Sequence, residues 1–271
     1  MSHWRFVPLV MSLLAVMLEK AAVPAQGKPE QSALNAVIDK AIKAHGGAVA
    51  LSKLKAQVWK DKGVVYSGGK QSAFTASYAL QIPAQFKLER EGTLPFTLHF
   101  NRDKAWLNGK ELTAAQVEQQ KEGAYVAWLT SQFPLRDKTL TLTFLGETVV
   151  DGRPALGVKI VSKGHRDIDI YFDQETGLMA KTVTRVVGMA SGAAIERETF
   201  RIAYKELDGI PVAMKYVIKQ GGKTLFEGEV TEWRRADHLD DKVFTPAPTA
   251  PKSGSRGTTL ATRGSIHGTK T

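Results

Sequence analysis

The chain has 271 residues, of which 43% are hydrophobic and 24% are charged, and it contains no cysteine. This composition excludes a disordered, collagen-like or disulfide-stabilised protein and predicts a globular fold with a core of its own. A formal net charge of +10 is typical of proteins that bind nucleic acid or anionic membranes, so the position of the charges along the chain decides its meaning.

The N-terminus has the pattern of a secretory signal peptide. Arg5 precedes an apolar run over residues 6–18, which is shorter than the roughly 20 residues that a helix needs to span a bilayer. Val23 and Ala25 then supply the small residues of a cleavage site. We expect residues 1–25 to be cleaved near Ala25 and the mature protein to lie in the periplasm. The alternative is a membrane anchor or a buried helix.

The C-terminal residues 245–271 are rich in Pro, Thr, Ser and Gly and contain four basic residues and no acid. Such a segment predicts a disordered basic tail. No linker divides residues 26–244, which we expect to form one domain. Export removes the chain from nucleic acid, so the basic charge indicates at most a peripheral contact with anionic lipid surfaces.

Two helices are predicted at the start of this domain. Apolar residues at helical spacing follow Ser32, the expected N-cap, and the helix ends before Gly46. His45 lies in the last turn, where the helix dipole favours a cation, and is therefore expected to cap the helix. A short second helix is expected over residues 48–54.

Most of the remaining chain alternates between apolar and polar residues, as expected for half-buried antiparallel strands. A third helix interrupts them over residues 114–133, with Thr113 as N-cap and Gly123 as a weak point or break. These patterns predict a mainly β (α+β) fold. We expect a large curled antiparallel sheet of about ten or eleven strands, forming a half-open barrel with an N-terminal helix and a central helical lid.

Few helices are available to cover the concave face of so large a sheet, so either side chains fill the interior or a cavity remains. A cavity with apolar and aromatic walls would suit acyl chains. The third helix is aromatic towards its C-terminal end, and these residues are either ordinary core or part of a lid that contacts ligand. The candidate ligand-binding residues are Tyr78, Leu80, Phe86, Leu88, Phe96, Leu98, Phe100, Tyr125, Trp128, Leu129, Phe133 and Phe144.

Several turns and strand ends resemble those of the LolA-like family of exported lipoprotein carriers and lipoprotein-sorting relatives. They are the hairpin IYFDQETGLMAKTV over residues 170–183, the DGIPV turn over residues 208–212, the terminal LDDKVF over residues 239–244 and the AHGG that ends the first helix. The resemblance covers roughly residues 30–246. It implies a half-closed antiparallel barrel with a helical lid that holds acyl groups and needs no cofactor.

The residue inventory offers no catalytic or metal centre. No two of the six histidines have the i, i+4 spacing of a metal-binding helix, and HExxH, GxSxG and P-loop motifs are absent from the sequence. We therefore expect a monomeric, non-enzymatic periplasmic protein that shields lipid or lipoprotein acyl chains, in lipoprotein sorting to the outer membrane. A cell-envelope assembly or sensor domain, with protein contacts and no lipid cargo, is the alternative. An enzyme acting on envelope glycans or lipids is the third reading.

Overall fold

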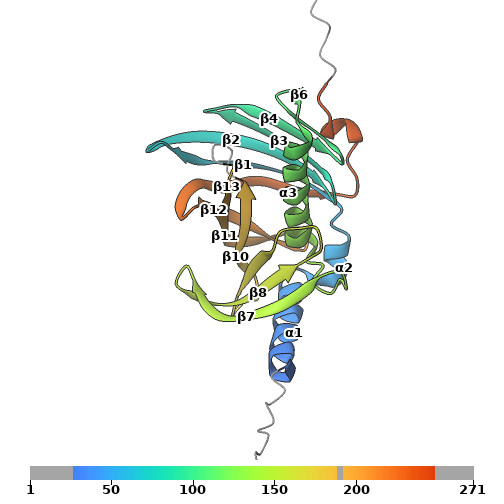
Figure 1. Ribbon diagram of the computed structural model, residues 1–271, viewed down its shortest axis with the longest axis vertical. Coiled ribbons are helices and arrows are strands. Elements are labelled where there is room, and N and C mark those ends of the chain that lie inside the picture. Colours follow the sequence, from blue (N-terminus) through green and yellow to red (C-terminus); the bar gives the residue numbers. More distant parts are fainter. Residues whose placement is uncertain (1–26, 188–191, 248–271) are drawn as a thin grey trace, which may run out of the picture.

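The computed structural model describes residues 27–187 and 192–247. The predicted signal peptide and residues 248–271 of the predicted basic tail lie outside these residues. Three α-helices are present, α1 (Gly27–Ala44), α2 (Gly47–Ser52) and α3 (Ala114–Gln132), and a short 3-10 helix, η1 (Asp241–Phe244), follows the last strand. Figure 1 shows the helices gathered on one side of a strongly curled sheet. No described helix has the length and apolar character to span a membrane.

The sheet contains thirteen strands, and each neighbouring pair is antiparallel. They are β1 (Ala56–Ser67), β2 (Lys70–Gln81), β3 (Gln85–Gly92), β4 (Phe96–Asn101), β5 (Lys104–Leu107), β6 (Lys110–Glu111), β7 (Thr141–Val150), β8 (Arg153–Val161), β9 (Ile168–Asp173), β10 (Met179–Val187), β11 (Ala194–Leu207), β12 (Ile210–Gln220) and β13 (Lys223–Ala236). The predicted fold class is confirmed. The strand number is higher than expected because β5 and β6 are too short to show alternation.

The sheet is open, and its strand order explains the position of α3. The order runs β6-β5-β4-β3-β2-β1-β13-β12-β11-β10-β9-β8-β7, so the two edge strands, β6 and β7, are consecutive in the chain and joined by α3. Within the described residues these two edges do not pair with each other. The sheet is thus an open curl, in agreement with the expected half-open barrel, and not a closed one; α3 runs between its two ends (Figure 1).

Helix α3 packs on both ends of the sheet. Its first half places Val117 and Ala124 against Phe100 of β4 and Ala105 of β5. Its second half contributes Leu129 to the largest core cluster. That cluster joins α1, α3 and the strands β8 and β9, and includes Leu34, Val37, Ile38, Ala41, Tyr125, Leu129, Val158, Ile160, Ile168 and Ile170. The helices therefore cover the two ends of the concave face and leave its middle to other side chains.

Two helix predictions are wrong and one is confirmed. Helix α1 begins at Gly27, so Ser32 lies inside it and is not its N-cap; Glu30 in the first turn favours this earlier start. Helix α3 continues through Gly123 because packing on both sides outweighs the roughly 1 kcal/mol that glycine costs. Thr113 caps α3 as predicted, and its backbone N–H donates to Gln116 Oε1 at 3.0 Å.

His45 follows the last turn of α1 and caps it as predicted, but its ring is buried and neutral and is not the cation that the helix dipole favours. It is 3% exposed, and its Nδ1 lies 2.8 Å from the carbonyl oxygen of Ala41. Its Nε2 accepts a hydrogen bond from the backbone N–H of Met179 at 3.2 Å. The two contacts define a neutral ring that donates through Nδ1. Burial lowers the pKa of His45 to about 4.

The ring of His45 also links separate parts of the core. It stacks on Phe133 at a centroid distance of 4.1 Å and meets Phe172 and Tyr204 edge-on at 6.4 and 6.1 Å. Phe133 ends α3, whereas the other two rings come from β9 and β11. His45 therefore holds the ends of α1 and α3 against the sheet.

We predict that this neutral histidine makes the fold sensitive to acid. Because the folded-state pKa of about 4 lies below the ordinary value of 6.5, the unfolded chain binds the extra proton between these pH values. The contribution of neutral His45 to the free energy of unfolding is fully present above pH 6.5, and about 3 kcal/mol of it is lost as the pH drops towards 4. Denaturant unfolding at pH 7 and pH 4.5 should show His45→Gln losing less stability across this interval than the wild type.

Replacement of the exposed His238 by Gln is the matched control and should leave the acid sensitivity unchanged. An equal loss in His45→Gln and the wild type would contradict the assignment.

Candidate functional site

A cavity of about 420 Å³ lies between the middle of the concave face and the helices. Its volume is within the range of small-molecule binding sites in proteins. The walls come from β1, β2, β3 and β10–β13, from α2 and from the C-terminal half of α3. Most of the lining side chains are apolar or aromatic, including Leu51, Leu54, Trp59, Tyr78, Leu80, Phe86, Ala127, Phe133, Met179, Tyr204, Val212, Tyr216, Ile218, Val230 and Trp233.

Local irregularities in the strands bring these side chains together. The register between β1 and β13 shifts at Lys60 and Asp61, so Val230 and Trp233, three residues apart, both line the cavity. In β11, Ala203 has a φ of 54° and interrupts the alternation, and the cavity is lined by both Arg201 and Tyr204. A regular strand would have turned one residue of each pair away.

Polar contacts fix α3 over the cavity. The indole N–H of Trp233 donates to Gln57 Oε1 at 2.8 Å, and Gln57 Nε2 donates to Ser131 Oγ at 3.2 Å. Gln132 Nε2 donates to the carbonyl oxygen of Leu54 at 2.9 Å. Helix α3 is thereby attached to β1, to β13 and to the segment after α2, and these hydrogen bonds also satisfy polar groups at the cavity wall.

A carboxylate lies at one end of the cavity. Asp61 is 2% exposed, and its Oδ2 accepts a hydrogen bond of 2.6 Å from the Tyr216 hydroxyl, whereas its Oδ1 has no partner among the described residues. Burial raises the pKa of Asp61, and the hydroxyls of Tyr216 and Tyr78 offset part of that rise. Burial and the nearby carboxyl raise the pKa of Tyr78 and Tyr216 as well, so both phenols stay protonated.

Tyr216 reaches Asp61 because Gly228 leaves room for its ring. Gly228 of β13 pairs with Tyr216 on one side and with Gly63 of β1 on the other. A Cβ atom at Gly228 would lie 2.2 Å from Tyr216 Cζ. The ring therefore lies flat over Gly228 and crosses β13 to meet the carboxyl.

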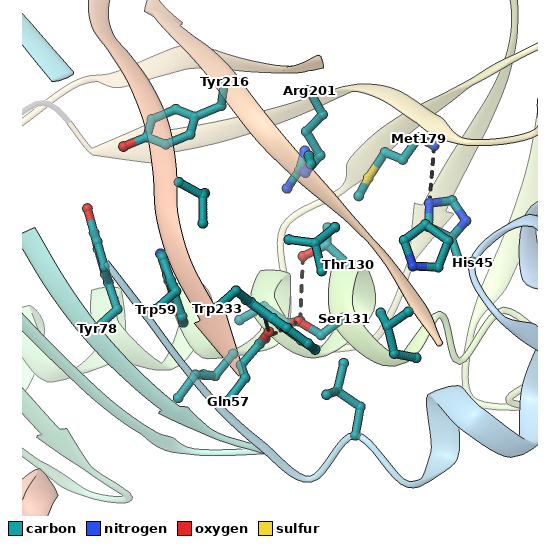
Figure 2. Close-up of a pocket in the computed structure, with 18 of the residues that line it drawn as sticks. His45, Gln57, Trp59, Tyr78, Thr130, Ser131, Met179, Arg201, Tyr216 and Trp233 are labelled. Carbon is teal, nitrogen blue, oxygen red and sulfur yellow. Dashed lines mark hydrogen bonds between the residues drawn. The ribbon is translucent and has the colours of Figure 1, made fainter. Parts of the chain in front are cut away.

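Arg201 is the cationic group of the cavity wall. Its Nη1 donates to Thr182 Oγ1 at 3.3 Å, and no carboxylate of the described residues forms an ion pair with it. Burial lowers the pKa of Arg201, but an arginine remains charged. In Figure 2 the guanidinium lies between the tyrosine pair, Tyr78 and Tyr216, at one end and His45 with Met179 at the other.

The structure separates the twelve predicted ligand-binding residues. Tyr78, Leu80, Phe86 and Phe133 line the cavity. Phe100, Tyr125 and Trp128 line a second hollow of about 360 Å³ beside the middle of α3. The remaining five line neither. Leu88 packs near Phe74, Phe96 lies under the guanidinium of Arg90, and Leu98 of β4 pairs with Leu107 of β5. Leu129 belongs to the main core, and Phe144 packs against it. Ligand contact by any of them stays a prediction.

Sequence reasoning missed the polar residues of the cavity, Asp61, Arg201 and Tyr216. Asp61 stands between Lys60 and Lys62 and reads as part of a charged, solvent-facing stretch. The irregular backbone at Asp61 and at Ala203, close to Arg201, is not visible in the sequence. The glycines inside β1 and β13 were the available signal, because a glycine within a strand often marks a close approach of another group. The described residues contain no group of three or more acidic, histidine or cysteine side chains placed to hold a metal ion.

An open, curled antiparallel sheet with helices on its concave face defines a class of fold with known members. No family model matches the sequence, and no curated protein matches it. Among solved structures, a LolA superfamily protein from Nitrosomonas europaea aligns with a TM-score of 0.52 and 8% identity, over 79% of this chain and 97% of that chain. A DUF1329 family protein from Desulfovibrio piger aligns with a TM-score of 0.51 and 11% identity, over 78% and 96%.

An outer membrane lipoprotein-sorting protein domain from Vibrio parahaemolyticus aligns at 0.49 with 12% identity, over 79% and 96%. At these identities the similarity is one of fold. The structure thus agrees with the fold that the turn motifs suggested, that of the LolA superfamily.

We predict that Gly228→Ala disrupts the Tyr216–Asp61 contact. The new methyl group would collide with the tyrosine ring, and overpacking of this kind lowers the free energy of unfolding by about 1–3 kcal/mol. Gly123→Ala is the control, because nothing lies within 4 Å of its added methyl group; it should raise stability by about 1 kcal/mol. Thermal unfolding of both variants measures the difference, and an unaltered stability of Gly228→Ala would contradict the close approach.

Proposed function

We propose that this protein is an exported, non-enzymatic carrier that shields an apolar ligand, such as a lipid or the acyl chain of a lipoprotein, in the cavity under α3. The observation that carries the proposal is the cavity of about 420 Å³ with its largely apolar and aromatic wall. A folded protein normally fills such a space with side chains, because interiors are close-packed.

The energetics suit an acyl ligand. Burial contributes about 0.8 kcal/mol per methylene group, so one chain of ordinary length supplies enough free energy for carriage after the costs of association. The volume is that of one chain or one small amphiphile and not of several chains. Leu51, Leu54 and Phe133 form an apolar part of the wall against which a chain can lie.

The finer parts of the proposal concern place and pathway. The predicted signal peptide supports a periplasmic location, and the fold shared with a LolA superfamily protein supports a role in lipoprotein sorting to the outer membrane. We propose a monomer that contacts membranes only peripherally and uses no cofactor. Its chemistry is the exclusion of water from the ligand, which needs no reacting group.

Native mass spectrometry of the mature protein, purified from its own cell envelope, tests the carrier directly. A lipid-sized adduct that is lost on delipidation is the expected result. A clean unliganded mass, combined with no uptake of a fluorescent fatty acid, would refute the proposal. A copurifying envelope protein without lipid would instead support the assembly or sensor alternative.

We predict that filling the cavity blocks uptake. Ala127 of α3 lines the cavity, and Ala127→Phe should occupy the space of the chain and weaken the binding of a fluorescent fatty acid about tenfold or more. Ala115→Phe makes the same change on the exposed first turn of α3 and should have no effect. Equal affinity of the two variants would place the ligand elsewhere.

Trp128→Ala then examines the second hollow, which Trp128 lines. Unchanged affinity is expected if the main cavity holds the chain. Weaker binding in this variant, with Ala127→Phe unaffected, would assign the ligand to the second hollow.

A further inference from the structure

The cavity contains two opposite charges that do not neutralise each other. Asp61 is buried with a free Oδ1, and Arg201 has only the Thr182 hydroxyl as a side-chain partner. Within the described residues neither forms an ion pair. A buried charge without a partner is costly, and most proteins avoid it. Asp61 is such a group, and Arg201, which is partly exposed, has no carboxylate beside it, so a ligand that carries both charges would supply both partners.

The sheet register places the two charges on the same face. Arg201 pairs with Tyr216, which pairs with Gly228, and Gly228 pairs with Gly63. Asp61 lies two residues before Gly63, so its side chain projects from the same side of β1. Adjacent strands lie about 4.8 Å apart, so the two main chains are separated by roughly 14 Å. Both side chains line the cavity, and the ring of Tyr216, which reaches Asp61 through its hydroxyl, partly spans this interval.

We infer that the cavity binds an amphiphile with a zwitterionic headgroup, namely a primary ammonium linked to a phosphate, as in the phosphoethanolamine headgroup of a lysolipid. The ammonium binds Asp61 Oδ1, and the phosphate binds the guanidinium of Arg201. The acyl chain extends along the apolar wall formed by Leu51, Leu54 and Phe133. This inference rests on the proposed carrier function and specifies its ligand class.

The surroundings of Asp61 favour a primary ammonium over other donors. An ammonium presents three N–H groups, one for the free Oδ1 and others for the oxygens of nearby phenols. The stacked rings of Trp59 and Tyr78 line the same end of the cavity and attract a cation through their faces. A glycerol headgroup offers hydroxyls but leaves the carboxylate unneutralised. A choline headgroup carries the charge but has no N–H to donate.

Three lysolipids with the same acyl chain test the inference on the delipidated protein. Lysophosphatidylethanolamine, lysophosphatidylglycerol and lysophosphatidylcholine should each displace a fluorescent fatty acid, with the ethanolamine lipid binding about tenfold or more tightly than either of the others. Asp61→Asn keeps the size of the side chain. It should lower the affinity for lysophosphatidylethanolamine, relative to that for lysophosphatidylglycerol, by at least tenfold. Arg201→Gln should weaken all three lipids, because each carries the phosphate.

Asp103→Asn, at an exposed carboxylate that pairs with Lys121, is the control and should leave the ranking unchanged. The wild-type ranking is informative even if a variant fails to fold, because it requires no substitution. If no lysolipid and no fatty acid binds the wild type, the carrier function itself is wrong. If all three lysolipids bind equally and Asp61→Asn leaves their ratio unaltered, the headgroup subsite is wrong and the carrier function stands.

Discussion

The extent of the sheet determines what the rest of the molecule can be. A single antiparallel sheet of thirteen strands curls and presents one concave face that has to be removed from water. Three helices are available, and they pack at the two ends of that face. The middle is left to large side chains projecting from β1, β2 and β11–β13, and these do not fill the space between the sheet and α3. The cavity is a direct result of that mismatch between sheet and helices.

Around the cavity, some groups make well-satisfied contacts that stabilise the fold, whereas two charged groups destabilise it through the loss of hydration. His45, Phe133 and the Gln57–Ser131 contact fix the helices in place with satisfied hydrogen bonds and stacked rings. Asp61 and Arg201 are held on rigid strands, although their burial opposes folding. Proteins retain such local conflicts mainly at functional sites. The stable frame supports the two charges, which is the arrangement expected of a preorganised binding site.

The sequence predicted the sheet well because alternation is a local property, and the Thr113 cap was recognisable for the same reason. The residues of the cavity were harder to predict from the sequence. Tyr78 and Leu80 follow simple alternation and were found, whereas Arg201 and Tyr204 share a wall through the irregular backbone at Ala203. The cap at His45 was predicted correctly, but its burial was not, because a helix end alone does not reveal the Met179 N–H and the aromatic rings around it. Contacts between distant strands decide these cases, and one sequence does not display them.

Helix α3 is the sole element of the described chain that joins the two edges of the sheet, since β6 and β7 do not pair. The width of the curl is therefore independent of the strand ladder. The interior can enlarge by a shift of one helix while each backbone hydrogen bond between strands is kept. A ligand of the proposed kind would therefore be admitted at the expense of the contacts of α3, including the Gln57–Ser131 and Gln132–Leu54 hydrogen bonds, and not of the strand ladder.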